Sequence, residues 1–265
     1  MAIDYIIDYA CYPKQELSVE GLLDRIKGRA RAEAVVDLFR RNGDERPVNE
    51  IGFEMVRSTP DGTEETRVVM VQALLDRASE LAPYEQYCAG CPANNTGSPF
   101  GCIEQIEYPI SGVAEIWLLN QLPTPDDTLI WLLLRQAVEE FKNDGSSVNP
   151  LRAAGNTYFQ EQGVLVRGLG EFNINTNQVF ELLFTLGHIR PSFASVLLLL
   201  FKVIRRDMDA DEIMRLSKSP ENAFEQYPFV LIPEADDDNS IRQIKRFFRA
   251  LYLAWGLDKR LLLDV

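Results

Sequence analysis

Histidine, cysteine and long apolar runs are scarce in this sequence, which has one histidine and four cysteines in 265 residues. A single histidine excludes a catalytic zinc site built from several histidines. The longest apolar stretch, residues 195–204, is shorter than the roughly 20 residues needed to cross a bilayer. The first residues also lack the basic start and apolar segment of a secretory signal. We therefore expect a cytoplasmic protein without a membrane segment.

Basic residues are also in short supply, because 27 Lys and Arg against 40 Asp and Glu give a formal net charge of -13. Nucleic acids and anionic lipids are bound through clustered Lys and Arg, so a surface devoted wholly to either is excluded. With 46% hydrophobic and 25% charged residues, the composition is that of a globular protein. The length suits one large domain or two smaller ones.

Three of the four cysteines, Cys88, Cys91 and Cys102, lie in one loop rich in Gly, Pro and Asn, and the fourth is Cys11. A CxxC pair lets two thiolates converge on one ion, and a third cysteine in the same loop favours a metal site. A reducing compartment favours metal ligands or redox thiols over structural disulfides.

Three interpretations of the cysteines stay open. The preferred one is structural zinc bound by all four thiolates, which form a closed tetrahedral site. An iron-sulfur cluster is the alternative cofactor, since proline follows a ligand cysteine in such loops and Pro92 follows Cys91. The third is unliganded thiols, because short motifs also arise by chance.

The first third of the sequence alternates between strand and helix patterns. Apolar alternation and helical periodicity predict a strand at residues 3–9, a helix at 18–42, strands at 51–55 and 66–71, a helix at 74–81 and a strand at 103–108. The turn at residues 59–62 makes the two middle strands a hairpin. This β-α-β-β-α-β order is that of the ferredoxin-like unit, in which two helices cover one face of a four-stranded antiparallel sheet.

The ferredoxin-like topology would also bring the cysteines together. Strand 1 ends, and strand 4 begins, at the same edge of such a sheet. Cys11 follows strand 1, whereas the other three cysteines lie between the second helix and strand 4. The predicted metal ligands are therefore Cys11, Cys88, Cys91 and Cys102.

The sequence beyond Ser111 is mainly helical. We predict helices at residues 113–121, 126–142, 177–186, 192–206, 210–217 and 239–255, and a small hairpin from residues 157–160 and 164–168 around Gly163. The predicted fold class is α+β. A ferredoxin-like domain with a cysteine-rich metal loop would span residues 1–111, and a mainly α-helical domain would span residues 112–265.

No catalytic residue is predicted. His188 lies in a turn between two predicted helices with no serine or cysteine motif beside it, so a packing or capping role is preferred over that of a general base. The acidic run at residues 234–238 lacks the ligand spacing and central glycine of an EF-hand loop. It is expected to cap the N-terminus of the last helix.

The last helix is predicted to have two faces. Its apolar face consists of Ile241, Ile244, Phe248, Leu251 and Trp255. Its basic stripe consists of Arg242, Lys245, Arg246 and Arg249. Solvation is the ordinary role of such a stripe, and the alternatives are binding of a partner's acidic surface or of a nucleic-acid backbone.

These patterns favour a non-catalytic, metal-stabilised protein that acts as a protein-protein interaction or regulatory module. Its partner would be another protein, bound through apolar faces of the helical half. An iron-sulfur or zinc-dependent enzyme is one alternative, and it requires an open or redox-active metal site. A nucleic-acid-binding protein is the other, and it requires the basic stripe to be exposed and unpaired.

Overall fold

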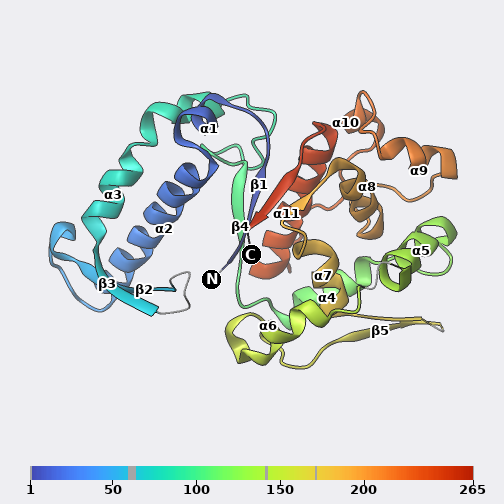
Figure 1. Cartoon of the computed structure of the whole chain (residues 1–265), viewed down its shortest axis with the longest axis horizontal. Coiled ribbons are helices and arrows are strands. Elements are labelled where there is room, and N and C mark those ends of the chain that lie inside the picture. Colours follow the sequence, from blue (N-terminus) through green and yellow to red (C-terminus); the bar gives the residue numbers. More distant parts are fainter. Residues whose placement is uncertain (1, 59–63, 141–142, 171, 265) are drawn as a thin grey trace. The chain divides into compact units, whose positions relative to one another are not determined.

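The computed structural model describes residues 2–58, 64–140, 143–170 and 172–264 (Figure 1). Helices and strands are mixed along the chain, so the predicted α+β class is confirmed. The contacts divide the chain into a larger unit, Met1–Tyr9 with Pro92–Val265, and a smaller unit, Ala10–Cys91. None of the helices in the described ranges combines the length and the apolar character that crossing a membrane requires.

A four-stranded antiparallel sheet with the order β4-β1-β8-β7 lies in the larger unit. Its strands are β1 (Ala2–Ile7), β4 (Ile103–Glu107), β7 (His188–Ile189) and β8 (Leu261–Asp264). In β1, Ile3 pairs with Ile106 and Tyr5 with Leu263. Residues on both faces of β1 are buried, including Asp4.

The larger unit contains more helix than strand. Its helices are α4 (Gly112–Gln121), α5 (Thr128–Arg135), α6 (Asn149–Ala153), α7 (Thr176–Phe184), α8 (Pro191–Leu200), α9 (Ala210–Leu216), α10 (Ala223–Gln226) and α11 (Asn239–Gly256). Short turns are the π-helical η3 (Gln136–Glu140) and the 3-10 helices η4 (Ser146–Val148) and η5 (Gly155–Thr157). Helix α11 contacts the sheet, α4 and α8, and its Phe247, Phe248 and Trp255 are fully buried.

The smaller unit contains a hairpin and two packed helices. Its elements are α1 (Tyr12–Leu17), α2 (Val19–Arg41), η1 (Val48–Glu50), β2 (Gly52–Ser58), β3 (Glu64–Met70), α3 (Val71–Ser79) and η2 (Ala82–Cys88). Helix α2 packs on α3, and Ala32, Ile51 and Val71 form a buried cluster. The pairing of β2 with β3 confirms the predicted hairpin, whereas its predicted turn at residues 59–62 lies outside the described residues.

The element order β-α-β-β-α-β is present, but the ferredoxin-like sheet is not confirmed. Strand β1 pairs with β4 on one side and with β8 on the other, so both of its edges are occupied. Strands β2 and β3 pair only with each other among the described strands. The predicted domain boundary after residue 111 falls inside the larger unit, whose sheet joins strands from both sides of it.

Two predicted elements of the helical half differ from the structure. The predicted pairing of residues 157–160 with 164–168 is wrong. Phe159 instead forms a bridge with Ile110, and β5 (Val166–Leu169) pairs with β6 (Phe172–Asn175). Helix α8 ends at Leu200 and not at residue 206. The side chain of Arg206 folds back and donates hydrogen bonds to the carbonyls of Leu199 and Leu200, which satisfies the end of the helix.

Candidate functional site

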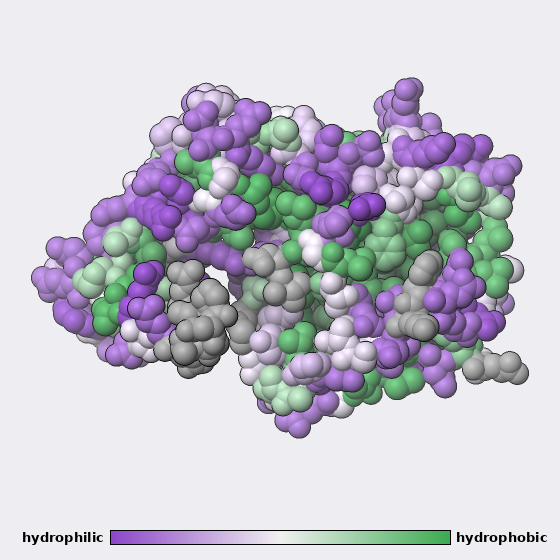
Figure 2. All heavy atoms as spheres, in the orientation of Figure 1, coloured by the Kyte–Doolittle hydropathy of each residue, from purple (hydrophilic) through white to green (hydrophobic). Residues whose placement is uncertain are grey.

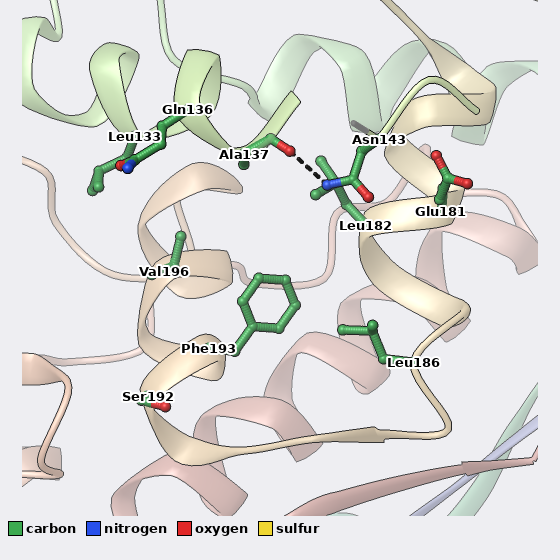
Figure 3. A pocket seen from close by; sticks show the side chains of 10 residues that line it. All are labelled: Leu133, Gln136, Ala137, Asn143, Glu181, Leu182, Leu186, Ser192, Phe193 and Val196. Atoms are coloured by element: carbon green, nitrogen blue, oxygen red, sulfur yellow. Dashed lines mark hydrogen bonds between the residues drawn. The ribbon is translucent and has the colours of Figure 1, made fainter. Parts of the chain in front are cut away.

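The larger unit contains a mainly apolar pocket of about 500 Å³ bounded by α5, η3, α7 and α8 (Figure 3). It is lined by Leu133, Gln136, Ala137, Asn143, Glu181, Leu182, Leu186, Ser192, Phe193 and Val196. Ala137 and Leu182 are buried, whereas Phe193 is half-buried. Figure 3 shows the side chains of Phe193 and Leu186 pointing toward one another.

A π-helical turn forms one side of this pocket. Helix α5 continues directly into η3, which contributes Gln136 and Ala137 to the lining. The side chain of Asn143 donates a hydrogen bond of 2.5 Å to the carbonyl of Ala137 (Figure 3). Single π-helical turns are frequent at functional sites, so the π-helical turn favours a functional role for this pocket.

Glu181 is the one charged residue among the described residues that line the pocket. Its Oε2 accepts a 2.7 Å hydrogen bond from the backbone N–H of Gly145, and its Oε1 accepts a 2.5 Å bond from the hydroxyl of Ser147. Both donors are neutral, and no cation within the described ranges forms an ion pair with Glu181. The carboxylate is therefore oriented by the fold while its negative charge is not balanced by these contacts.

Exposed leucines extend the apolar surface beyond the pocket. On α5, Leu129 is 39% exposed and Leu132 is 54% exposed, and after α7, Leu186 is 52% exposed. Leu129, Leu132, Leu133 and Gln136 follow a spacing of three and four residues, which places them on one helix face. Figure 2 shows hydrophobic residues gathered on the surface over α5. We call the set Leu129, Leu132 and Leu133 the α5 ridge.

The structure places three predicted metal ligands, Cys11, Cys88 and Cys91, in the smaller unit and Cys102 in the larger one. None of these four described cysteines forms a disulfide. The backbone N–H of Cys91 donates a 3.3 Å hydrogen bond to the carbonyl of Cys88, which closes the CxxC turn. The rings of Tyr12 and Tyr87 lie 4.8 Å apart, so Cys11 and Cys88 are sequence neighbours of two residues in contact.

The described residues contain one group of three potential metal-ligand atoms within 4.8 Å of one another, and it consists of Glu234, Asp236 and Asp237. This group contains no cysteine, so the four-cysteine site stays a prediction. Asp237 is already engaged, because the Lys245 Nζ lies 2.8 Å from each of its carboxylate oxygens. Lys245 and Asp237 therefore form a buried ion pair within the acidic group. Lys245 also donates a hydrogen bond to the carbonyl of Ile232.

The expected capping role of the acidic run is confirmed by Asp238. Its Oδ1 accepts a 2.8 Å hydrogen bond from the backbone N–H of Ile241, which makes Asp238 the N-cap of α11. The hydroxyl of Ser111, the N-cap of α4, donates to the other carboxylate oxygen of Asp238. The starts of the two helices are thus joined.

His188 lies in strand β7, where the sequence suggests a turn. Its Nε2 is 3.4 Å from the Nε of Arg190, which donates to it. No described serine or cysteine is hydrogen-bonded to the imidazole. The packing or capping role expected for His188 stays a prediction.

The apolar face predicted for the last helix is confirmed, since Ile244, Phe248 and Leu251 of α11 are fully buried. The basic stripe is wrong at Lys245, which is buried and bound to Asp237. A lysine on a solvent-facing stripe needs no partner, but this one reaches a buried carboxylate. The four cations therefore do not form a continuous exposed stripe.

The remaining members of that stripe differ in their contacts. Arg242 donates to the backbone carbonyl of Asp237, and Arg246 lies 3.5 Å from Glu104. Arg249 is exposed. These contacts give no support to a nucleic-acid surface on α11.

A second cavity of about 410 Å³ in the larger unit is lined in part by Tyr108, Ser147 and Phe180. Burial raises the pKa of Tyr108 to about 12, and the neighbouring Tyr158 adds to the shift. The phenol is therefore protonated at neutral pH and is not suited to act as a base.

A third cavity of about 450 Å³ includes Asp127 and Arg206. Burial lowers the pKa of Arg206 to about 10, while Asp127 opposes that shift. Arg206 stays cationic at neutral pH, and its guanidinium is occupied by the carbonyls at the ends of α4 and α8.

Comparison of the chain with protein-family models, with curated proteins and with solved structures found no match. Functional evidence therefore comes from the residues themselves. The pocket joins an apolar interior, an oriented carboxylate and adjoining exposed leucines. Sites with these properties bind ligands or partner proteins.

Proposed function

We propose that the protein is a non-catalytic interaction or regulatory module that binds a partner protein at the pocket and the α5 ridge. The observation that carries this proposal is the continuity between an apolar pocket and exposed leucines. Leu132 and Leu186 each expose about half of their surface beside the pocket. Covering apolar surface stabilises a complex by roughly 25 cal/mol per Å² before the costs of association are subtracted.

The α5 ridge favours a protein over a small molecule as the partner. A small ligand in the pocket would leave Leu129 and Leu132 exposed, because neither residue lines the cavity. A helix or loop of another protein can fill the pocket with one side chain and cover the ridge with others. Helix-in-groove recognition uses side chains at such three- and four-residue spacing.

Site-specific photo-crosslinking in cells that produce the protein tests this proposal. The photoreactive amino acid replaces Leu132, and in a matched control it replaces Met214 of α9, which is 72% exposed. We expect one discrete heavier product from position 132 that disappears when Leu186→Asp is added. Products that are equal at both positions, or insensitive to Leu186→Asp, would contradict the proposal.

We also propose that the cysteines bind a structural zinc ion, in a reducing cytoplasm that keeps the thiols available. The CxxC turn of Cys88 and Cys91 supports this, as does the contact of Tyr12 with Tyr87 beside Cys11 and Cys88. Cys102 is the fourth ligand predicted from the sequence. Four thiolate ligands would leave no open position for a substrate, which agrees with a non-catalytic role.

Elemental analysis and an absorption spectrum of protein purified without oxygen test the metal. We expect about one zinc per chain and no visible absorption band, because zinc has a filled d shell. Iron with broad visible absorption would instead favour the iron-sulfur alternative and reopen an enzymatic role. Protein with neither metal would contradict the proposed site.

A further inference from the structure

We infer that the partner presents a basic amphipathic helix, with an apolar side chain that enters the pocket and a Lys or Arg that reaches Glu181. This inference rests on the proposed function and specifies the chemistry of the partner. It combines the apolar lining, the oriented carboxylate and the direction of the α5 ridge.

The hydrogen bonds of Glu181 carry the charge part of the inference. Gly145 and Ser147 hold one carboxylate oxygen each, so the group is fixed before any partner arrives. A preorganised carboxylate loses little conformational entropy when it pairs with a cation. Hydrogen bonds between a carboxylate and Lys or Arg are roughly twice as strong as neutral ones. A cationic partner group is therefore the complement of this site.

The neighbouring charges do not cancel that preference. Arg135 of α5 lies 3.0 Å from Glu139 and forms an ion pair with it. Arg190, before α8, directs its Nε to His188. Gln136 in the pocket lining donates to the carboxylate of Glu140, which adds a second acidic group beside the pocket. Among the described residues no ion pair joins a cation to Glu181 or Glu140, so these two carboxylates at the pocket keep their negative charge.

The ridge defines the shape of the partner segment. From Leu129 to Gln136 the residues of one face span about two helical turns, or roughly 10 Å at 1.5 Å per residue. A row at this spacing packs against the complementary row of another helix. The partner helix would place successive apolar residues along the ridge and its anchor in the pocket, with the basic residue one turn away.

Selection from a displayed library of random helical peptides tests the inference with the full-length protein. Peptides are selected on the wild type and counter-selected on Leu186→Asp, which alters an exposed pocket residue. The binding of the enriched peptides is then measured on Glu181→Gln and on a control, Glu225→Gln, which removes an exposed acid of α10. The amide oxygen that Glu181→Gln introduces can still accept a hydrogen bond, and thermal unfolding verifies that each variant is folded.

We expect enriched peptides with apolar residues at three- and four-residue spacing and a Lys or Arg one turn from the anchor. Their affinity should fall roughly tenfold for Glu181→Gln and be unchanged for Glu225→Gln. Pocket-dependent peptides without a basic residue, or without sensitivity to Glu181→Gln, would overturn the inference but leave the proposed function standing. If no selected peptide binds the wild type more tightly than it binds Leu186→Asp and Leu132→Asp, both the inference and the proposed function would be overturned.

Discussion

The guanidinium of Arg152 donates two hydrogen bonds, of 2.7 and 2.6 Å, to the carboxylate of Glu115, and both side chains are buried. Its nitrogen atoms also donate to Asn177 and Thr176 at the start of α7. The guanidinium carbon lies 3.7 Å from the centroid of the Phe159 ring. One buried cation thus links α4, α6 and α7, and α7 is a wall of the proposed binding pocket.

Loss of this buried cation should be strongly destabilising. Arg152→Met leaves Glu115 buried without its partner, so we expect the free energy of unfolding to fall by about 3–5 kcal/mol. Arg135→Met, which breaks the exposed pair with Glu139, should cost about 0–1 kcal/mol. Urea unfolding of both variants measures the difference. Similar, small losses would show that the Arg152 network does not stabilise the fold.

The apolar face of α11 gives a second prediction. Phe248 is fully buried and Arg249 is exposed, although the two are adjacent in sequence. Phe248→Asp places an unpaired charge in the core and should cost several kcal/mol, whereas Arg249→Ala should cost less than about 1 kcal/mol. Thermal melts of the two variants provide the test. Equal melting temperatures would mean that the opposite helix face is packed.

The cysteine loop gives a third prediction through Gly101. A Cβ atom at this position would lie 2.1 Å from the Oγ1 of Thr96 and 2.2 Å from the Oδ1 of Asn94. Gly101→Ala therefore forces the loop to move and should cost about 1–3 kcal/mol. Gly163→Ala is the control, because a Cβ there meets nothing within 4 Å. Equal unfolding midpoints in urea would refute the close packing of the loop.

The metal proposal predicts that Cys11→Ser loses zinc as severely as Cys91→Ser, although 76 residues separate Cys11 from Cys88 (88 − 11 − 1 = 76). Loss of metal should also lower the melting temperature, because the free energy of binding a structural metal is coupled to folding. Elemental analysis of the purified variants measures occupancy. Full zinc in Cys11→Ser would exclude Cys11, and full zinc in Cys102→Ser would exclude the fourth ligand.

Local sequence patterns predicted the helices and strands of this protein better than they predicted which strands pair with one another. The start of a helix at Ser18, the capping acid Asp238 and the buried face of α11 each depend on neighbouring residues, and the structure contains all three. The sheet depends on residues far apart in the chain. No strand was predicted for Leu261–Asp264, yet β8 occupies the edge of β1 that a ferredoxin-like sheet would use.

The site was harder to predict for the same reason. The pocket is assembled from three separate segments, and its leucines have the same periodicity as ordinary core residues. Only the exposure of Leu132 and Leu186 distinguishes them, and exposure is a tertiary property. Lys245 illustrates the converse, because helical periodicity places it on the solvent face while its flexible chain reaches the buried Asp237.

Calorimetric titration with the partner recovered by crosslinking at Leu132 tests whether the pocket and the α5 ridge form the binding surface. Wild type is compared with Leu186→Asp and with Met214→Asp, which adds the same charge at an exposed apolar residue of α9. We predict that Leu186→Asp weakens binding at least about tenfold, or about 1.4 kcal/mol, while Met214→Asp changes it less than about twofold. Equal affinities for all three proteins would contradict this assignment of the binding surface.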